Sequence, residues 1–421
     1  MSVSSVKISL PAQGAGSSPS LLRQLNAAAV LRVIREGGSV TRPEIARHTG
    51  LSKPTVKYIV EALLNDGYIR ERLPDGEVQP RRPGPRANVL SFRPDLGHVL
   101  GLDIGANKIL ALVTDLDGRI IASERRRCSD ARDVEAVLAA ASQVARRALD
   151  RAGITADELS AAAVGTPGVV ELSSGRITLA PQLPGWEGLP LASRLAESLG
   201  RPVLADNEVH LALLAERWRG AIQGVDNAFL VHIGVGIGCG ILIGGQLYRG
   251  ATGAAGEMGY LPIVDTDEMP AGNIGPFEHA AGGGAYARLG QRAAAGPVGA
   301  FLRELAGGDP GAVSAEIVFA AAARGDAAAQ AVVDELVGRL ARGIAAAIVL
   351  LNPAVVVVGG GVSKAGKALL APLERAVCDL VPVVPQFVLT TLDDAAGALG
   401  AVKIALEAVD ASSLAFATEA S

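Results

Sequence analysis

The sequence predicts an α/β protein with a small helical head in front of a larger body. First, residues 21–68 show the apolar spacing of three short helices. Second, apolar strands alternate with alanine-rich helices after Gly97, which is typical of buried sheets. Third, residues 1–95 carry a net charge of +6 and residues 96–421 a net charge of −10, so only the head is suited to a polyanion.

The head contains start and stop signals for each helix. Apolar residues over Leu22–Ile34 form the first helix, which ends at Gly37-Gly38. The segment Thr41–Glu44 is a capping box that begins a second helix, and Ser52–Gly67 spans a third. The turn Pro74-Asp75-Gly76 and a basic, proline-rich stretch follow. Three helices, a tight turn and a wing predict a winged helix-turn-helix.

The polar side chains of this head are candidates for DNA contact. Thr55 and Lys57 are expected at base edges, and the wing arginines in a minor groove or on phosphates. The predicted contact residues are Arg42, Ser52, Lys53, Thr55, Lys57, Tyr58, Arg81, Arg82 and Arg86. The alternative is a helical subdomain for protein contacts, whose charges are merely solvated.

The pattern of the body indicates alternating strands and helices, and its length of about 320 residues predicts two lobes. Its predicted strands are Val99–Ile104, Ile109–Thr114, Ala161–Val164, Phe229–Ile233 and Ala354–Val358. Its predicted helices are Val134–Ala152, Leu191–Leu199, Glu208–Arg217, Ala327–Leu350 and Lys364–Cys378. Arg125-Arg126-Arg127 is interpreted as a solvated strand end.

Two polar glycine turns follow strands of the body. Backbone N–H groups in such turns can face phosphate, and an aspartate at a strand end can hold a hydrated cation. Each turn alone is equally compatible with a plain β-hairpin. The candidate phosphate-loop residues are Asp103, Gly105, Lys108, Gly234, Gly236 and Gly238.

Several classes of protein are excluded by composition. The three cysteines are far apart in the sequence, which argues against a disulfide framework or a cysteine zinc site. The longest apolar stretch, Gly343–Val362, is interrupted by Asn352-Pro353 and is not expected to span a membrane. Residues 1–19 are interpreted as a disordered tail without a signal peptide, so a cytoplasmic location is expected.

The chain from about Leu21 resembles the ROK family of repressors and sugar kinases. The resemblance rests on the order of several motifs: Asp103-Ile104-Gly105, Thr166-Pro167-Gly168, Leu183-Pro184-Gly185-Trp186, Asn207–Ala212, Gly250–Gly259 and Asn352–Gly361. It implies two actin-like ATPase lobes behind the winged helix-turn-helix. The implied ranges are 1–19 for the tail, 20–92 for the DNA-binding domain, 96–217 plus 397–412 for the first lobe, and 218–396 for the second.

The resemblance also implies a ligand cleft between the lobes. Amides and carboxylates suit polyols because they donate and accept hydrogen bonds in pairs. The alternative is that Glu257 only satisfies backbone amides and that Glu278 only caps a helix. The predicted effector-binding residues are Gly168, Asn207, Glu208, Glu257, Tyr260 and Glu278.

Departures from the family pattern predict lost catalysis. Glu208 stands where the resemblance places an aspartate general base, and a misplacement of about an ångström can reduce the rate by about 100-fold. The first loop reads Gly105-Ala106-Asn107 in place of Gly-Gly-Thr. Tyr260 replaces a zinc-binding histidine, and Met269–Pro276 contains none of the expected cysteines, so no zinc is expected. Together with the altered first loop, the loss of the aspartate base also argues against binding of ATP with magnesium.

The resulting hypothesis is a regulator, and specifically a repressor of carbohydrate-related genes. Its expected partners are operator DNA, a small carbohydrate or sugar-phosphate effector, and a second or further copies of the chain in a dimer or tetramer. Two alternatives remain open. One is an active ATP-dependent sugar kinase with a DNA-binding domain, and the other is a repressor whose cleft binds no ligand.

Overall fold

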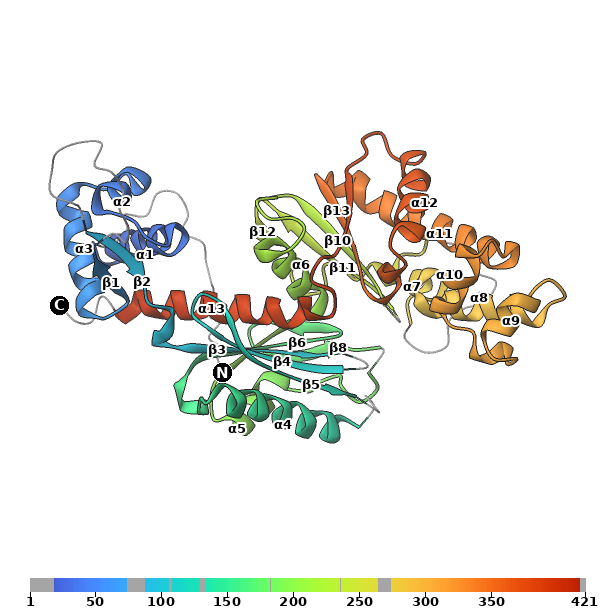
Figure 1. Cartoon of the computed structure of the whole chain (residues 1–421), viewed down its shortest axis with the longest axis horizontal. Helices are drawn as coiled ribbons and strands as arrows, with labels where there is room; N and C mark the ends of the chain where they lie inside the picture. Colours follow the sequence, from blue (N-terminus) through green and yellow to red (C-terminus); the bar gives the residue numbers. More distant parts are fainter. Residues whose placement is uncertain are drawn as a thin grey trace, which may run out of the picture. The chain divides into compact units, whose positions relative to one another are not determined.

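The computed structural model describes residues 19–73, 88–105, 108–128, 133–181, 183–234, 236–263 and 274–416. It forms two compact units (Figure 1). The smaller unit comprises the chain up to Gly97 together with residues 115–119 and the chain from Leu406 onward. The larger unit comprises His98–Thr114 and Ile120–Ala405. Nearly all of the predicted N-terminal tail, and the predicted turn at 74–76, lie outside the described residues.

The smaller unit contains three helices and a short sheet. Its helices are α1 (Pro19–Gly37), α2 (Arg42–Thr49) and α3 (Lys53–Asn65), and its strands are β1 (Ile69–Arg72) and β2 (Val89–Phe92). The two strands pair in antiparallel orientation, and Val40 adds a bridge to Leu90. The apolar face of α3 predicted by its spacing is buried against α1 and α2. The winged helix-turn-helix prediction is therefore confirmed for the described part of this unit.

Arg35, in the last turn of α1, binds three separate segments of the smaller unit. Its guanidinium donates to both carboxylate oxygens of Asp410 at 2.9 Å, lies 3.3 Å from Asp117, and donates to the Leu116 carbonyl. It also stacks 4.5 Å from the centre of the Phe92 ring. A single half-buried side chain therefore holds α1 to the β4–β5 turn and to the end of the last helix.

Replacing Arg35 by alanine is expected to loosen α1. Loss of a bidentate ion pair and a cation–π contact is worth about 1–2 kcal/mol, so amide exchange in α1 should accelerate roughly tenfold. Hydrogen-exchange mass spectrometry measures this directly. Arg32→Ala, which removes an exposed cation one turn earlier in α1, serves as the control. Equal exchange rates in the two variants would contradict the assigned role of Arg35.

The first sheet of the larger unit has the strand order β5-β4-β3-β6-β9. Its strands are β3 (His98–Ile104), β4 (Lys108–Asp115), β5 (Ile120–Arg127), β6 (Leu159–Thr166) and β9 (Val203–Asn207). Helices α4 (Val134–Ala152) and α5 (Leu191–Leu199) pack on one face and bury Trp186 with them. Helices α6 (Glu208–Arg219) and α13 (Ala396–Phe416) contact each other closely, and Gly400 permits this contact because a Cβ there would lie 2.0 Å from the Leu211 carbonyl oxygen. A small sheet, β7 (Val169–Glu171) with β8 (Arg176–Leu179), completes this half.

The second sheet has the order β12-β11-β10-β13-β14. Its strands are β10 (Ala228–Ile233), β11 (Ile237–Ile243), β12 (Gln246–Leu247), β13 (Val355–Gly359) and β14 (Gln386–Leu389). The helices of this half are α7 (Pro276–Ala281), α8 (Gly283–Ala295), α9 (Ala300–Leu305), α10 (Ala315–Ala323), α11 (Ala327–Leu351) and α12 (Lys367–Cys378). Strands β10, β13 and β14 run parallel, as a buried α/β sheet requires.

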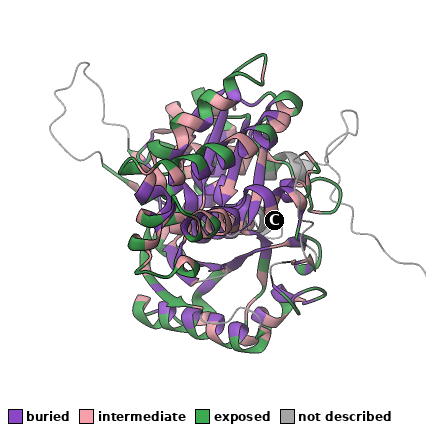
Figure 2. Ribbon diagram, turned by 90° about the vertical axis from the view of Figure 1, so that its right-hand side faces the viewer, coloured by how far each residue is buried: buried purple, intermediate pink, exposed green. Residues whose placement is uncertain are grey.

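Burial follows the predicted pattern of apolar strands covered by helices. In Figure 2 the strands are mostly buried, and the helices expose one face each. The five predicted helices of the body all form, although the last begins at Lys367 because the preceding turn, Gly361–Ala365, is a 3₁₀-helix. Across the described ranges, no helix has the combined length and apolarity that crossing a bilayer requires.

Candidate effector cleft and nucleic-acid interface

A cavity of 1430 Å³ lies in the larger unit, where its two sheets present the ends of their strands. Asp103, Asn207 and His232 lie at or next to the ends of strands β3, β9 and β10, and all three line it. The carboxyl ends of parallel strands form the usual ligand crevice of an open α/β sheet. All of the predicted effector and phosphate-loop residues line this cavity. Their roles as ligand contacts stay predictions.

Asn207 connects the loop Thr166–Gly168 to the start of α6. Its side-chain oxygen accepts hydrogen bonds from the amides of Val209 (2.8 Å) and His210 (3.2 Å), and its Nδ2 donates to the Gly168 carbonyl at 2.7 Å. Gly168 has a φ of 92°, and a Cβ there would lie 2.3 Å from the Leu179 carbonyl oxygen, so only glycine fits. Asn207 retains one amide hydrogen, which can donate to a ligand.

Glu208 is the first residue of α6 and reaches the first glycine turn. Its Oε2 lies 3.6 Å from the position that a Cβ at Gly105 would take. Burial and the neighbouring Asp103 carboxylate raise the pKa of Glu208 to about 8, although Lys108 acts in the opposite direction. Burial therefore favours the protonated form of this carboxyl. The protonated form donates a hydrogen bond, whereas the ionised form can accept a proton from a hydroxyl.

Asp103 and Lys108 form an ion pair in the first glycine turn. The Lys108 Nζ lies 3.3 Å from Asp103 Oδ2 and donates to the Asp394 carbonyl. Asp103 Oδ1 is buried and has no hydrogen-bond partner among the described residues, and burial raises the pKa of this carboxyl. This oxygen is compatible with a hydrated cation. Ala106 and Asn107 lie outside the described residues.

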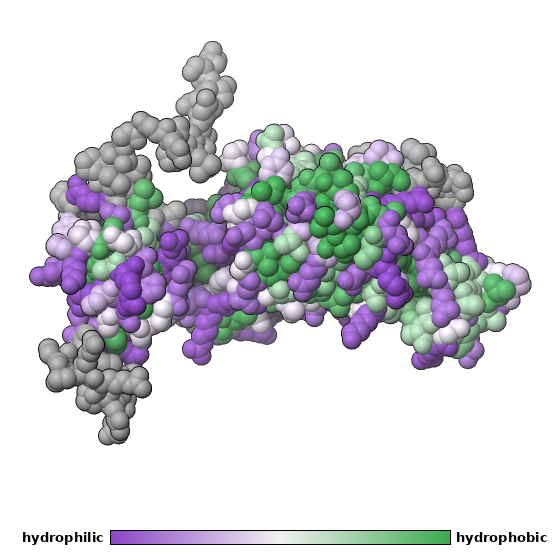
Figure 3. All heavy atoms as spheres, turned by 90° about the horizontal axis from the view of Figure 1, so that it is seen from above, coloured by the Kyte–Doolittle hydropathy of each residue, from purple (hydrophilic) through white to green (hydrophobic). Residues whose placement is uncertain are grey.

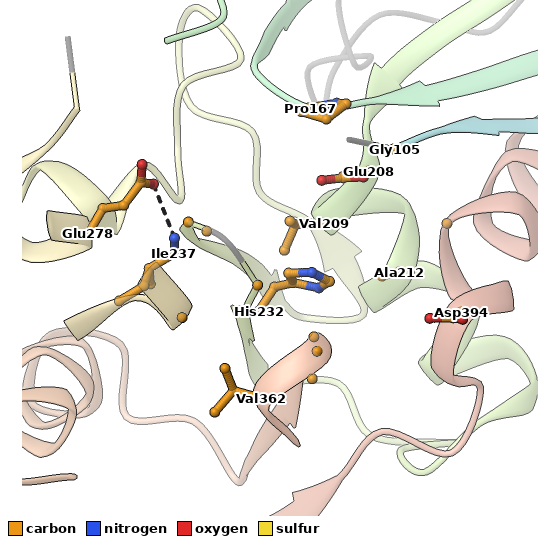
Figure 4. Close-up of a pocket in the computed structure, with 18 of the residues that line it drawn as sticks. Gly105, Pro167, Glu208, Val209, Ala212, His232, Ile237, Glu278, Val362 and Asp394 are labelled. Atoms are coloured by element: carbon orange, nitrogen blue, oxygen red, sulfur yellow. Dashed lines mark hydrogen bonds between the residues drawn. The ribbon is translucent and has the colours of Figure 1, made fainter. Parts of the chain in front are cut away.

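Three predicted residues lie on the opposite wall of the cavity. Glu278, on α7, accepts a hydrogen bond from the Ile237 amide at 3.1 Å (Figure 4). Burial raises the pKa of the Glu257 carboxyl, and the nearby Glu278 adds to this effect. Tyr260 exposes 38% of its surface, and burial together with these two carboxylates raises its pKa. This wall presents hydroxyl and carboxyl groups, which suit polyols.

The zinc ion that the resemblance would imply does not fit these residues. The raised pKa keeps the Tyr260 phenol neutral, whereas zinc binds thiolate, imidazole or carboxylate. Cys239 is the nearest thiol in this region of the sequence, and it is buried in the apolar core of the second half together with Met258 and Phe277. Residues 264–273, which hold most of the segment Met269–Pro276, lie outside the described residues.

The second glycine turn is explained in part by packing. The Gly283 amide, at the start of α8, donates to the Gly234 carbonyl at 2.9 Å, and a Cβ at Gly238 would lie 3.2 Å from Val209. Gly234, Gly236 and Gly238 all line the cavity. The close approach of α6 accounts for the lack of a side chain at Gly238, and a Cβ at Gly234 would lie 3.3 Å from His232 Nε2. The phosphate role of this turn stays a prediction.

Several cavity residues were not predicted as site residues. His232 points into the cavity near Val209 (Figure 4), and burial lowers its pKa to about 4, so the imidazole is neutral. Arg125, Arg126 and Arg127 form the exposed end of β5, as predicted, and Arg125 and Arg127 also line the cavity. Asp394 accepts from Arg125 at 2.7 Å and lies 3.6 Å from Lys364, so it connects residues next to the two sheets. Alternation along a strand predicts that Arg125 and Arg127 share one face, but it does not tell which face meets the cavity.

A buried ionic network supports the wall that carries Glu257. Asp206 Oδ2 accepts hydrogen bonds from Arg249 Nε at 2.9 Å and Nη2 at 2.7 Å. Asp206 Oδ1 lies 3.2 Å from His210 Nδ1. His210 Nε2 lies 2.9 Å from the Ala255 carbonyl oxygen. This network joins α6 to the loop Gly250–Gly259. One partner of His210, Ala255, is 45 residues away in the sequence, so the sequence alone did not reveal this role of His210.

In the smaller unit, α3 presents the predicted DNA-contact residues in two ways. Lys53, Lys57 and Tyr58 are exposed, and Lys57 makes only a 3.8 Å surface pair with Glu61. The Ser52 hydroxyl caps α3 and lies 2.7 Å from the Thr55 hydroxyl, so these two polar groups are already engaged.

Arg42 lies at the start of α2 and forms a two-point ion pair with Glu71. This pair occupies its guanidinium within the unit. Arg81, Arg82 and Arg86 lie outside the described residues. DNA contact by each named residue stays a prediction.

Comparisons with known proteins match both units. The ROK family model matches residues 99–408, and a winged helix-turn-helix DNA-binding model matches residues 28–70. The xylose repressor of Caldicellulosiruptor bescii is 28% identical, covering 85% of this chain and 88% of the repressor. The glucokinase of Thermotoga maritima is 30% identical, covering 74% of this chain and 98% of the enzyme. A solved structure of a ROK family transcriptional regulator, a homologue of the Escherichia coli MLC protein, aligns over 94% of this chain and 99% of its own length. The TM-score is 0.77 and the sequence identity is 24%, so this likeness shows the fold.

Proposed function

We propose that this chain, which belongs to the ROK family and carries a winged helix-turn-helix domain, is a carbohydrate-responsive transcriptional repressor. The predicted family and fold class are confirmed by the matches to both units. The observation that carries the proposal is a polyol-type cleft, lined by Asn207, Glu257 and Glu278, whose base position holds Glu208 in place of an aspartate. The relative from C. bescii, named a xylose repressor, supports a sugar as the effector class.

We further propose that the larger unit has no kinase activity and needs neither zinc nor magnesium-bound ATP. Glu208 is a hydrogen-bond donor at neutral pH, so it holds a ligand hydroxyl in place of activating it. Tyr260 offers a hydroxyl where a metal ligand would be needed. These residues support ligand binding and oppose turnover.

The cleft offers a route from binding to regulation. Its walls come from two sheets, and a ligand that binds both walls favours one arrangement of the two halves. Such a ligand changes the affinity for DNA only if the arrangement that it favours binds DNA more tightly or more weakly than the other arrangement. An operator with two half-sites needs two reading heads, so we propose a dimer or a higher oligomer, checked by light scattering. Figure 3 shows apolar side chains gathered on one face, and the exposed apolar residues include Val349, Leu350, Leu380, Val383 and Val384.

Binding of the full chain to DNA from upstream of its own gene tests the proposal. The measurement is made at two salt concentrations, with and without a panel of neutral and charged sugars. We expect sequence-selective binding that weakens with salt and that one sugar weakens further. Binding without selectivity for sequence, under every condition, would remove the repressor proposal.

The second candidate is an active sugar kinase, which the retained Asp103 and Lys108 favour. We expect sugar-dependent ADP release at roughly 1% or less of an ordinary kinase rate, because a misplaced base reduces the rate about 100-fold. A coupled assay with ATP, magnesium and the sugar panel measures this rate. Ordinary turnover that Glu208→Gln abolishes would establish the kinase.

A further inference from the structure

The strand β5 presents different side chains on its two faces. Glu124 is buried against α4, where it pairs with Arg151 at 2.6 Å, and Arg126 donates to Gln143 of the same helix at 2.8 Å. Arg125 and Arg127 line the cavity, whereas Arg126 does not. Because side chains alternate along a strand, the arginine run is divided between the helix face and the cleft face.

The neighbouring strand adds a third cation to the cleft face. Lys108 is the direct cross-strand partner of Arg127, and Leu110 is the partner of Arg125. Directly opposed side chains share one face and lie about 4.5–5.5 Å apart, where like charges destabilise the pair. Lys108 and Arg127 are therefore placed close together on the cavity wall, where their like charges repel each other.

Two of the three cations have a counter-charge, and the third has none in the described part of the chain. Lys108 pairs with Asp103, and Arg125 pairs with Asp394. For Arg127, the described residues supply neither an ion pair nor a hydrogen bond, and its side chain is exposed. An arginine fork that is free in a cleft binds a carboxylate or a phosphate through two parallel hydrogen bonds.

We propose that the effector is an anionic carbohydrate, and that Arg127, together with Lys108, binds its phosphate or carboxylate group. This inference rests on the proposed function, because it assigns a class to the effector of the same cleft. The polyol part of the ligand lies toward Asn207, Glu257 and Glu278.

Calorimetry on the full chain tests the assignment with matched ligands. Glucose, xylose and N-acetylglucosamine are each compared with their terminal phosphate ester and with their terminal carboxylate. We expect one anionic form to bind at least about tenfold more tightly than its neutral parent, with a larger difference at about 50 mM than at about 300 mM salt. The phosphate and carboxylate arms distinguish the two sources of the anionic group. Inorganic phosphate is the ligand control, and equal binding of it would overturn a carbohydrate assignment.

Two variants on the same strand separate a specific site from general charge. Arg127→Gln should remove most of the preference for the anionic form, whereas Arg126→Gln, on the helix face, should retain it. Equal preferences in the two variants, or neutral sugars that bind as tightly as their anionic forms, would overturn the inference. If neutral sugars then still release operator DNA, the proposed carbohydrate-responsive repressor stands and only the anionic effector is excluded. If no carbohydrate binds, both the carbohydrate-responsive repressor and the anionic effector are excluded.

Discussion

Replacing Lys53 and Lys57 together by alanine is expected to lower operator affinity by about 100-fold or more at physiological salt. Both side chains are exposed on α3, and neither is tied to a strong partner within the described residues. Lysines at this position on a reading helix neutralise phosphates and release condensed counterions. The dependence of log K on log salt should become shallower by roughly 0.9 for each phosphate that is no longer neutralised. Fluorescence anisotropy with labelled operator DNA, over a salt series, measures both quantities.

The matched control is Arg32→Ala, which removes an exposed cation from α1. It should retain affinity within about twofold if α3 is the reading helix, since surface substitutions elsewhere have small effects. Thermal melting shows that both variants remain folded. If the double lysine variant and the Arg32 control have the same affinity and salt dependence, α3 does not bind the operator.

The sequence predicted those parts of the fold that depend on local pattern. The strand Val99–Ile104 is apolar apart from Asp103 because both faces of its sheet are covered, and it appears with nearly the same bounds. Helix α4 was predictable from Asp133 as its cap and Gly153 as its end, both of which the structure shows. Motif order also placed Asn207 and Gly168 in one site, where the Asn207 side chain donates a hydrogen bond to the Gly168 carbonyl.

Long-range pairing could not be predicted in the same way. Whether Arg125 faces α4 or the cleft depends on the position of β5 at the edge of its sheet, and three consecutive arginines contain no such information. Asp394 follows β14 in the sequence, far from Lys108 and Arg125. The pKa of Glu208 likewise depends on Asp103, over a hundred residues earlier, and on burial that only the assembled cleft provides.

Glu208→Gln is expected to stabilise the protein increasingly as the pH rises from about 5 to 8. The folded pKa of Glu208 is raised to about 8, so between its unfolded value and pH 8 the folded state holds a proton that the unfolded state has lost. Stability therefore falls as the pH rises through this window, by at most about 1.4 kcal/mol per pH unit, and the partial exposure of Glu208 reduces this. Glutamine cannot ionise, so the variant should be about 1–2 kcal/mol more stable than the wild type at pH 8 and equal to it near pH 4.5.

Melting temperatures of the two proteins between about pH 4.5 and 8.5 test this expectation. His232 has a pKa lowered to about 4, so stability is lost as the pH falls from about 6.5 toward 4. This effect is common to both proteins and is removed by taking their difference. Glu208→Asp retains an ionisable carboxyl and should retain a falling stability with pH. A difference between wild type and Glu208→Gln that stays constant over the whole range would show that Glu208 is ionised at neutral pH, and this carboxylate would then be able to serve as a catalytic base.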